Sequence, residues 1–135
     1  MKDILILGAG TAGTMMANKL SKSPKSDEFR LTIVDKDETH YYQPGFLFIP
    51  FRIYSKEDVI KPKKNFFPKD TNVIVSEIDL IKPEENKVHL SNGDVLSYDY
   101  LIIATGTEIR PDEIEGMTDL DVILALEVPR SELMD

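Results

Sequence analysis

The stretch DILILGAGTAG, residues 3–13, constrains the fold more than any other part of the sequence. Ile4–Leu7 are four consecutive aliphatic residues, a pattern typical of a short strand that is buried on both faces in a parallel sheet. Gly8, Gly10 and Gly13 follow with the spacing GxGxxG. A buried strand that leads through a glycine-rich turn into a helix predicts an α/β fold.

A helix and a second strand complete a βαβ unit. The apolar residues of the helix recur every four positions: Ala12, Met16 and Leu20. The pattern breaks before Pro24, and Leu31–Val34 then form a second apolar run that ends at Asp35. An acid at this place, after the second strand, is what a dinucleotide-binding unit requires.

Each of these residue types has a physical role in dinucleotide binding. Gly8 permits a tight turn, Gly10 lets the backbone approach a pyrophosphate, and Gly13 allows close packing of helix and strand. The amides at the helix start face the phosphates, and an acid can accept hydrogen bonds from both ribose hydroxyls. The alternative, that the glycines only turn the chain and the acid only ends a strand, leaves this combined context unexplained. The candidate residues here are Gly8, Ala9, Gly10, Thr11, Ala12, Gly13, Asp35 and Lys36.

The second half of the chain favours FAD over NAD as the dinucleotide. Asn72–Ile81, Lys87–Leu90 and Val95–Ser97 are β-like, and Asn92-Gly93 between the last two is a strong hairpin signal. Leu101–Ile103 then predict another buried strand, which stops at Thr105-Gly106. A nicotinamide-binding domain would continue with alternating strands and helices instead of this antiparallel β-meander and return strand.

These motifs together resemble a known superfamily. GAGTAG, the acid after the second strand and YDYLIIATGTEIRP are similar to the FAD-binding half of the pyridine nucleotide-disulfide oxidoreductases. Within that superfamily, HYYQPGFLFIPF and the following RIYSKEDVIKP most resemble sulfide:quinone oxidoreductases and flavocytochrome c sulfide dehydrogenase flavoproteins. The resemblance covers about Lys2 to Gly116, and it implies a Rossmann-like fold with FAD as cofactor.

The resemblance also implies further FAD-binding positions. Gln43 and Pro44 would lie near the ribityl chain or the isoalloxazine ring, and Ile78 would contact adenine through its backbone. Three residues at the end of the return strand would lie close to FAD: Ala104, Thr105 and Gly106. The apolar residues at 46–49 would pack beneath the cofactor or face a quinone or a partner domain; alternatively, they belong to a loop that covers a sheet edge. Pro44 and Pro50 predict that this segment is neither regular helix nor sheet.

The chain departs from the resembled proteins in several ways. It has no cysteine, no second glycine-rich βαβ unit and no closing Gly-Asp segment. We therefore expect residues 1–135 to be one incomplete FAD-binding domain, an N-terminal fragment of a longer two-dinucleotide-domain flavoprotein that is inactive alone. Its exposed sheet edge favours a homodimer or pairing with the missing domains. The catalytic residues stay unknown at this stage.

Charge and composition exclude several other classes of function. The net charge of −8, from 24 acids and 16 bases, argues against nucleic-acid binding, and the basic run at Lys61, Lys63 and Lys64 reads as a solvated surface. With no cysteine and only two histidines, no metal site is expected. The sequence shows no apolar run long enough for a membrane span and no secretory signal. We expect a cytoplasmic location, peripheral to the membrane only through regions absent from this chain.

Two classes of function follow. The first is the FAD-binding portion of a sulfide:quinone oxidoreductase-like enzyme, in which electrons pass from sulfide through the flavin to a quinone. A variant of this hypothesis is a relative of type II NADH:quinone oxidoreductase or of ferredoxin reductase. The second class is a non-catalytic module that binds NAD or ADP in the same cradle.

Overall fold

The computed structural model describes residues 1–107 and 113. The end of the TEIRP motif and the last part of the resemblance, up to Gly116, lie outside these residues. The strands are β1 (Lys2–Leu7), β2 (Phe29–Asp35), β3 (Thr39–Tyr41), β4 (Ile60–Pro62), β5 (Asn72–Val75), β6 (Ile78–Lys82), β7 (Lys87–Leu90), β8 (Val95–Ser97) and β9 (Tyr100–Ile103). The helices are α1 (Thr11–Ser21), α2 (Gln43–Phe46) and α3 (Lys56–Val59), with 3-10 turns at Ser26–Glu28, Lys63–Phe66 and Pro83–Glu85.

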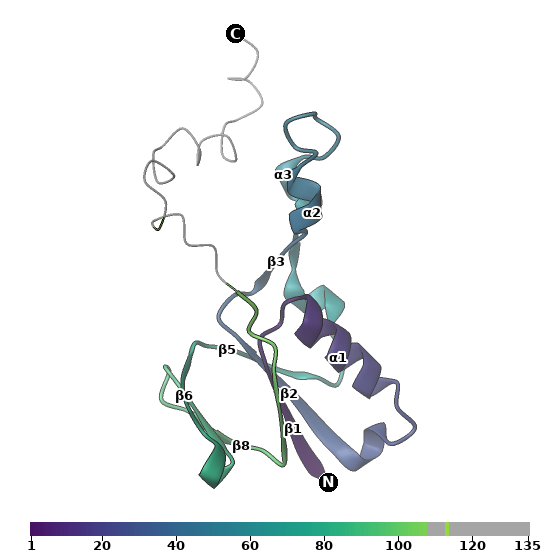
Figure 1. Cartoon of the computed structure of the whole chain (residues 1–135). Coiled ribbons are helices and arrows are strands. Elements are labelled where there is room, and N and C mark those ends of the chain that lie inside the picture. Colours follow the sequence, from purple (N-terminus) through teal and green to yellow (C-terminus); the bar gives the residue numbers. More distant parts are fainter. Residues whose placement is uncertain (108–112, 114–135) are drawn as a thin grey trace.

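A four-stranded parallel sheet with the order β5-β2-β1-β9 forms the centre of the domain (Figure 1). The register pairs Ile4 with Leu31 and Ile6 with Ile33 across β1 and β2. All the strands of this sheet run in one direction, so their carboxyl ends share one edge. The α/β prediction is confirmed, and the residues that follow β1, β2 and β9 all emerge at this edge.

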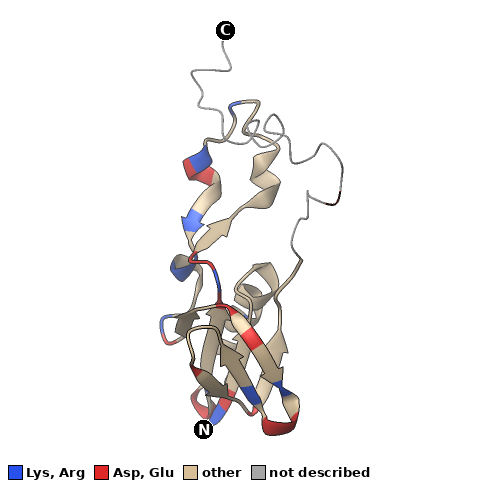
Figure 2. Cartoon of the chain, turned by 90° about the vertical axis from the view of Figure 1, so that its left-hand side faces the viewer, with Lys and Arg blue, Asp and Glu red and all other residues tan. Residues whose placement is uncertain are grey.

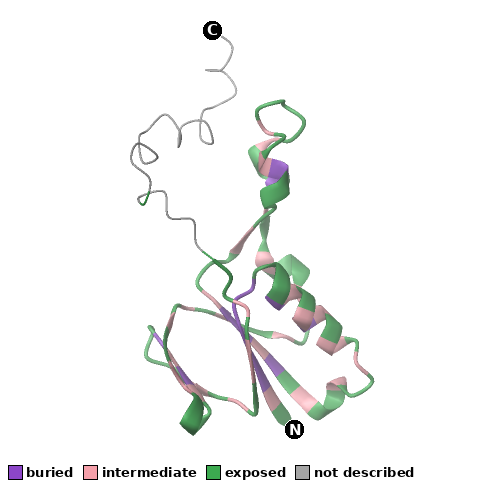
Figure 3. Ribbon diagram, in the orientation of Figure 1, coloured by how far each residue is buried: buried purple, intermediate pink, exposed green. Residues whose placement is uncertain are grey.

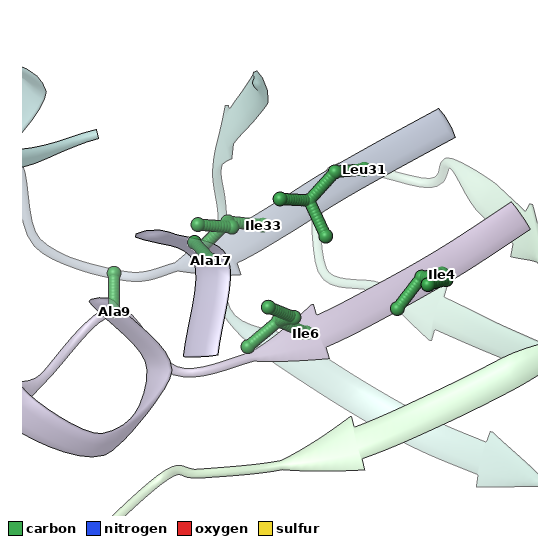
Figure 4. Packing of buried hydrophobic residues seen from close by; sticks show 6 residues of the cluster. All are labelled: Ile4, Ile6, Ala9, Ala17, Leu31 and Ile33. Atoms are coloured by element: carbon green, nitrogen blue, oxygen red, sulfur yellow. The ribbon is translucent and has the colours of Figure 1, made fainter. Parts of the chain in front are cut away.

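Each face of β1 supplies one hydrophobic core. Ile4 and Ile6 pack with Ala17 of α1 and with Leu31 and Ile33 of β2 (Figure 4). The alternate residues of β1 face the other way and pack against the meander. They belong to a second cluster formed by Leu5, Leu7, Val34, Val88 and Leu90. Full burial of one such side chain contributes about 1.5–3 kcal/mol, so the apolar run of β1 stabilises both layers.

The antiparallel β-meander predicted from the sequence is confirmed as β6-β7-β8. The predicted run 72–81 is divided into β5 and β6, because the chain leaves the parallel sheet at Ser76, whose amide donates to the Asp35 carbonyl over 3.0 Å. The Asn92-Gly93 turn closes the β7-β8 hairpin, and Gly93 adopts a φ of 93°. Lys87 pairs with Ser97 in the resulting register.

A separate arm projects from the carboxyl edge of the sheet (Figure 1). Its base is the antiparallel pair β3 and β4, and its upper part carries α2 and α3. The prediction that residues 40–51 avoid regular structure is wrong in part. His40 belongs to β3, and Pro44 lies in the first turn of α2, where its missing amide hydrogen would have no partner within the helix.

The predicted burial of the last strand is also wrong. Leu101 and Ile102 are half-buried, and Ile103 is 62% exposed (Figure 3). The physical reason is that, among the described residues, β9 is an edge strand that pairs with β1 on one side only. Its apolar side chains are therefore only partly covered by residues 1–107.

Among the described residues, no helix is long and apolar enough to cross a membrane. The same part of the chain contains no group of three or more His, Cys, Asp or Glu side chains that could hold a metal ion. Basic and acidic residues lie together on α3 of the arm, whereas α2 carries no charged residue (Figure 2).

Candidate dinucleotide-binding site

The glycine-rich turn between β1 and α1 is tightly enclosed at two of its three glycines. Gly8 has a φ of 94°, and a Cβ atom there would lie 2.3 Å from the carbonyl oxygen of Ala104. A Cβ atom on Gly13 would lie 1.9 Å from the carbonyl oxygen of Gly8. At both positions the backbone itself excludes any side chain.

Gly10 differs from the other two glycines because it faces open space. It is exposed, its φ of −70° is ordinary, and a Cβ atom there would have no atom of residues 1–107 within 4 Å. Thr11 and Ala12 beside it are exposed as well. The approach to this turn is therefore clear on the side where a pyrophosphate would lie.

The first turn of α1 offers hydrogen-bond donors that the described part of the chain does not use. Gly10 caps the helix without a side-chain hydrogen bond, and the first turn contains no acidic residue. The first amides of a helix have no partner within it, and they carry the positive end of the helix dipole. This end of α1 is suited to an anionic group such as a diphosphate.

Asp35, at the carboxyl end of β2, is held by three donors. Its Oδ2 accepts a hydrogen bond of 2.5 Å from the amide of Ala9. Its Oδ1 accepts from the amide of Asp37 at 2.8 Å and from Nζ of Lys63 at 2.7 Å. The carboxylate is therefore fixed next to the glycine-rich turn.

The charge state of Asp35 follows from these contacts. Burial on its own raises the pKa of the carboxyl group. The hydrogen bonds from Lys63 and from the backbone amides of Asp37 and Ala9, together with the attraction of the Lys63 charge, outweigh burial and hold the pKa below its ordinary value. Asp35 is consequently an anion at neutral pH, ready to accept hydrogen bonds.

Lys63 is the residue that sequence reasoning missed. The basic run predicts a solvated surface, yet the Lys63 side chain is only 12% exposed and forms an ion pair with Asp35. No local pattern distinguishes Lys63 from Lys61 or Lys64. Only the tertiary fold brings residue 63 to the end of β2.

A cavity of about 580 Å³ adjoins this ion pair. It lies beside the carboxyl ends of β2 and β5, and it is partly open to solvent. Charged and apolar side chains both contribute to its wall. Its lining includes Ala9, Asp35, Lys63, Phe67, Val73 and Val75. An apolar wall beside a carboxylate fits a flat base attached to a ribose.

The remaining candidate residues lie on several elements, some of them beside the glycine-rich turn and Asp35 and others away from both. Ala104 donates its amide to the Leu7 carbonyl over 2.7 Å, and Thr105 and Gly106 follow it, exposed, at the same sheet edge. Gln43 and Pro44 lie on the projecting arm (Figure 1). Lys36 follows Asp35 and is exposed, whereas Ile78 begins β6 and packs toward the meander core. The fold thus gathers the glycine loop, Asp35 and Ala104–Gly106, with the arm standing beside them.

This arrangement defines a Rossmann-like dinucleotide-binding domain, and comparison with known proteins gives its family. Residues 2–131 match the family described as pyridine nucleotide-disulphide oxidoreductase. The chain is 34% identical over 116 residues to a mitochondrial sulfide:quinone oxidoreductase of Dictyostelium discoideum, covering 86% of this chain and 25% of that protein. It is 32% identical over 119 residues to a type II NADH:quinone oxidoreductase of Staphylococcus aureus, covering 87% and 29%.

Solved structures agree with this result at the level of the fold. The sulfide:quinone oxidoreductase of Aquifex aeolicus superimposes with a TM-score of 0.70 at 24% identity, over 82% of this chain and 25% of that one. The chain thus spans about a quarter of the length of these relatives.

The chain belongs to the pyridine nucleotide-disulphide oxidoreductase family. It is a domain of that family with a Rossmann-like fold, which confirms the predicted superfamily, fold class and FAD cofactor. The open face at Gly10, the free end of α1 and the Asp35 carboxylate fit the adenosine and diphosphate portion of FAD.

Proposed function

We propose that the chain is the FAD-binding portion of a sulfide:quinone oxidoreductase-like enzyme. In this proposal the turn Gly8–Gly13 holds the diphosphate, Asp35 and Lys36 bind the adenosine end, and Ala104–Gly106 approach the cofactor from β9. The observation that carries it is the open face at Gly10 beside a fixed, ionised Asp35. When bound, FAD supplies the electron transfer, and the residues of this chain bind and orient it.

The sulfide branch is favoured by the arm as well as by similarity. Residues 40–51 of the arm, HYYQPGFLFIPF, are the segment on which the resemblance to sulfide oxidoreductases rests. In this proposal Gln43 and Pro44 lie toward the flavin end and Ile78 lies toward the adenine. Sulfide and a quinone are the proposed substrates of the whole enzyme.

The arm also supports pairing with further protein. Leu47, Phe51 and Ile53 are 73%, 75% and 62% exposed. Large apolar side chains exposed together are typical of surfaces that another protein region covers. In our proposal, this region is the remainder of the flavoprotein or a second copy of the chain.

The type II NADH:quinone oxidoreductases are the second candidate branch, because the chain is similar to one of them over nearly the same length. The two branches differ in electron donor. The two branches are distinguished by anaerobic addition of sulfide or of NADH to the flavin-loaded protein, expressed as the full product of its natural gene. We expect sulfide to bleach the flavin and a quinone to restore its colour; bleaching by NADH alone would select the second branch.

FAD binding by the chain itself is tested by its visible absorption spectrum. The purified chain is incubated with FAD, freed of excess cofactor and compared with a Gly10→Val variant treated in the same way. We expect a flavin band for the wild type and none for the variant. A folded wild-type chain that binds NAD or ADP but retains no FAD would favour the non-catalytic module instead.

A further inference from the structure

We propose that Lys63 is a specificity-determining residue that, with Asp35, selects a ribose with two adjacent free hydroxyl groups. In this proposal one hydroxyl donates to Asp35 and the other accepts from Lys63. The inference rests on the proposed adenine-dinucleotide site. It assigns a binding role to a residue outside the glycine motif and the sheet.

The hydrogen bonds of Asp35 limit what this residue does alone. A carboxylate has about four acceptor positions. Two positions on Oδ1 are used by Lys63 and the Asp37 amide, and one on Oδ2 is used by the Ala9 amide. With these contacts intact, one acceptor position is left, on Oδ2. The expectation that Asp35 accepts both ribose hydroxyls therefore needs revision.

Lys63 supplies what the second hydroxyl needs. An ammonium group has three N–H donors, and in the described part of the chain one of them is used, on Asp35. The same side chain lines the cavity. Each ribose hydroxyl is both a donor and an acceptor, so a neighbouring carboxylate and ammonium match a vicinal diol.

The backbone holds Lys63 in place before any ligand binds. Its own amide donates to the Glu38 carbonyl over 2.8 Å. At the other end of the 3-10 turn, Asn18 of α1 donates its Nδ2 to the Phe66 carbonyl over 2.7 Å, and Phe67 packs on the core. A side chain anchored on both sides is preorganised, which lowers the entropic cost of binding.

The charges around the cavity favour an unphosphorylated ribose. Asp35 and Lys63 neutralise each other, while Asp37, Glu38 and Lys64 also line the wall. A phosphate on the ribose would meet these carboxylates and would have to break the Asp35–Lys63 pair. A neutral diol keeps the pair intact.

The experiment is a calorimetric titration of the chain with ADP, 2′-deoxy-ADP and 3′-deoxy-ADP, alongside FAD. Variants are Lys63→Met, which removes the ammonium, and Lys63→Arg, which keeps charge and donors. Lys69→Met is the matched control, because Lys69 is exposed and is not part of the lining of this cavity. A hydrogen bond to a charged group changes affinity by roughly tenfold or more.

We expect the wild type and Lys69→Met to bind ADP and FAD equally, and to bind each deoxy analogue about tenfold less well. Lys63→Met should bind ADP and FAD about tenfold more weakly and should no longer distinguish ADP from one of the deoxy analogues. Lys63→Arg should keep the discrimination.

Three results would overturn the inference: equal wild-type affinities for ADP and both analogues, unchanged affinity in Lys63→Met, or weaker affinity with full discrimination. If Lys63→Met does not fold, as judged by circular dichroism, the wild-type analogue series and Lys63→Arg decide. A folded wild type that binds neither FAD nor any ADP form would refute the proposed function itself, a result that is distinct from the other three.

Discussion

The amide of Ala9 donates a hydrogen bond to Oδ2 of Asp35, which ties the glycine-rich turn after β1 to the carboxyl end of β2. The same carboxylate carries the ion pair with Lys63. One side chain thus connects three segments of the chain that are far apart in sequence. Removal of the Asp35 side chain should therefore lower the stability of the domain as well as its affinity for the cofactor.

Asp35→Ala should destabilise the domain by roughly 2–4 kcal/mol, because it leaves the mostly buried Lys63 ammonium and two backbone amides without their acceptor. Urea unfolding of Asp35→Ala, Lys63→Met and the double variant measures the coupling. We expect the double variant to be more stable than the sum of the single losses predicts. Strict additivity would mean that the two side chains do not interact.

The lowered pKa of Asp35 predicts the direction of one pH effect. In the folded state the carboxylate is favoured relative to the unfolded chain, whose Asp pKa is about 3.9. The stabilisation is therefore fully present above that value and is lost as pH falls through the lower folded pKa. Asp35→Asn should reduce the loss of stability between neutral and acidic pH in chemical unfolding. Parallel curves for wild type and variant would contradict this assignment.

Gly10→Val and Gly13→Ala should impair the domain in different ways: the first should lose FAD and the second should lose stability. Gly10 has open space around it and an ordinary φ, so the valine variant should stay folded, with a cost of about 1 kcal/mol for a poorer helix cap, and should not retain FAD. Gly13→Ala places a Cβ atom against the Gly8 carbonyl and should destabilise the domain by about 3 kcal/mol or more. Thermal unfolding and flavin absorption distinguish them. Retained FAD in Gly10→Val would refute the diphosphate site.

Ser55→Ala should loosen the arm without disturbing the sheet. Ser55 and Asp58 form a capping box at α3, with the Ser55 amide and hydroxyl both 2.8 Å from the Asp58 carboxylate. Loss of such a cap costs about 1 kcal/mol locally. Hydrogen exchange should quicken at 56–59 and stay unchanged in β1. A slowed or unchanged exchange in the arm would show that the cap contributes nothing there.

The sequence predicts those parts of this fold that depend on neighbours along the chain. Strand β1, the glycine turn and α1 are encoded within about twenty residues, and the β7-β8 hairpin is encoded by its Asn-Gly turn. The burial of Ile103 could not be judged in the same way, because it depends on whether another strand lies beside β9. An apolar run indicates a strand but does not reveal its place in the sheet.

The candidate site shows the same division. The glycines and Asp35 could be identified because their spacing is fixed by the βαβ unit. Lys63 could not, because the ion pair joins residues 28 positions apart through a turn with no regular pattern. Helix α2 begins at Gln43, and its first turn accepts Pro44; a proline in the sequence indicates a break in a helix as readily as the beginning of one.

The arm leaves the sheet just after Asp35 and returns at Lys63. The ion pair between these two residues therefore holds the two ends of the arm together. Two further bonds fasten the base: the Lys63 amide to the Glu38 carbonyl and the Tyr42 amide to the Val59 carbonyl, both 2.8 Å. Changes in length or composition near the tip, around Phe51, should therefore leave the positions of Asp35 and Lys63 unchanged. The fold separates a peripheral region that tolerates change from a base whose geometry is fixed by these bonds.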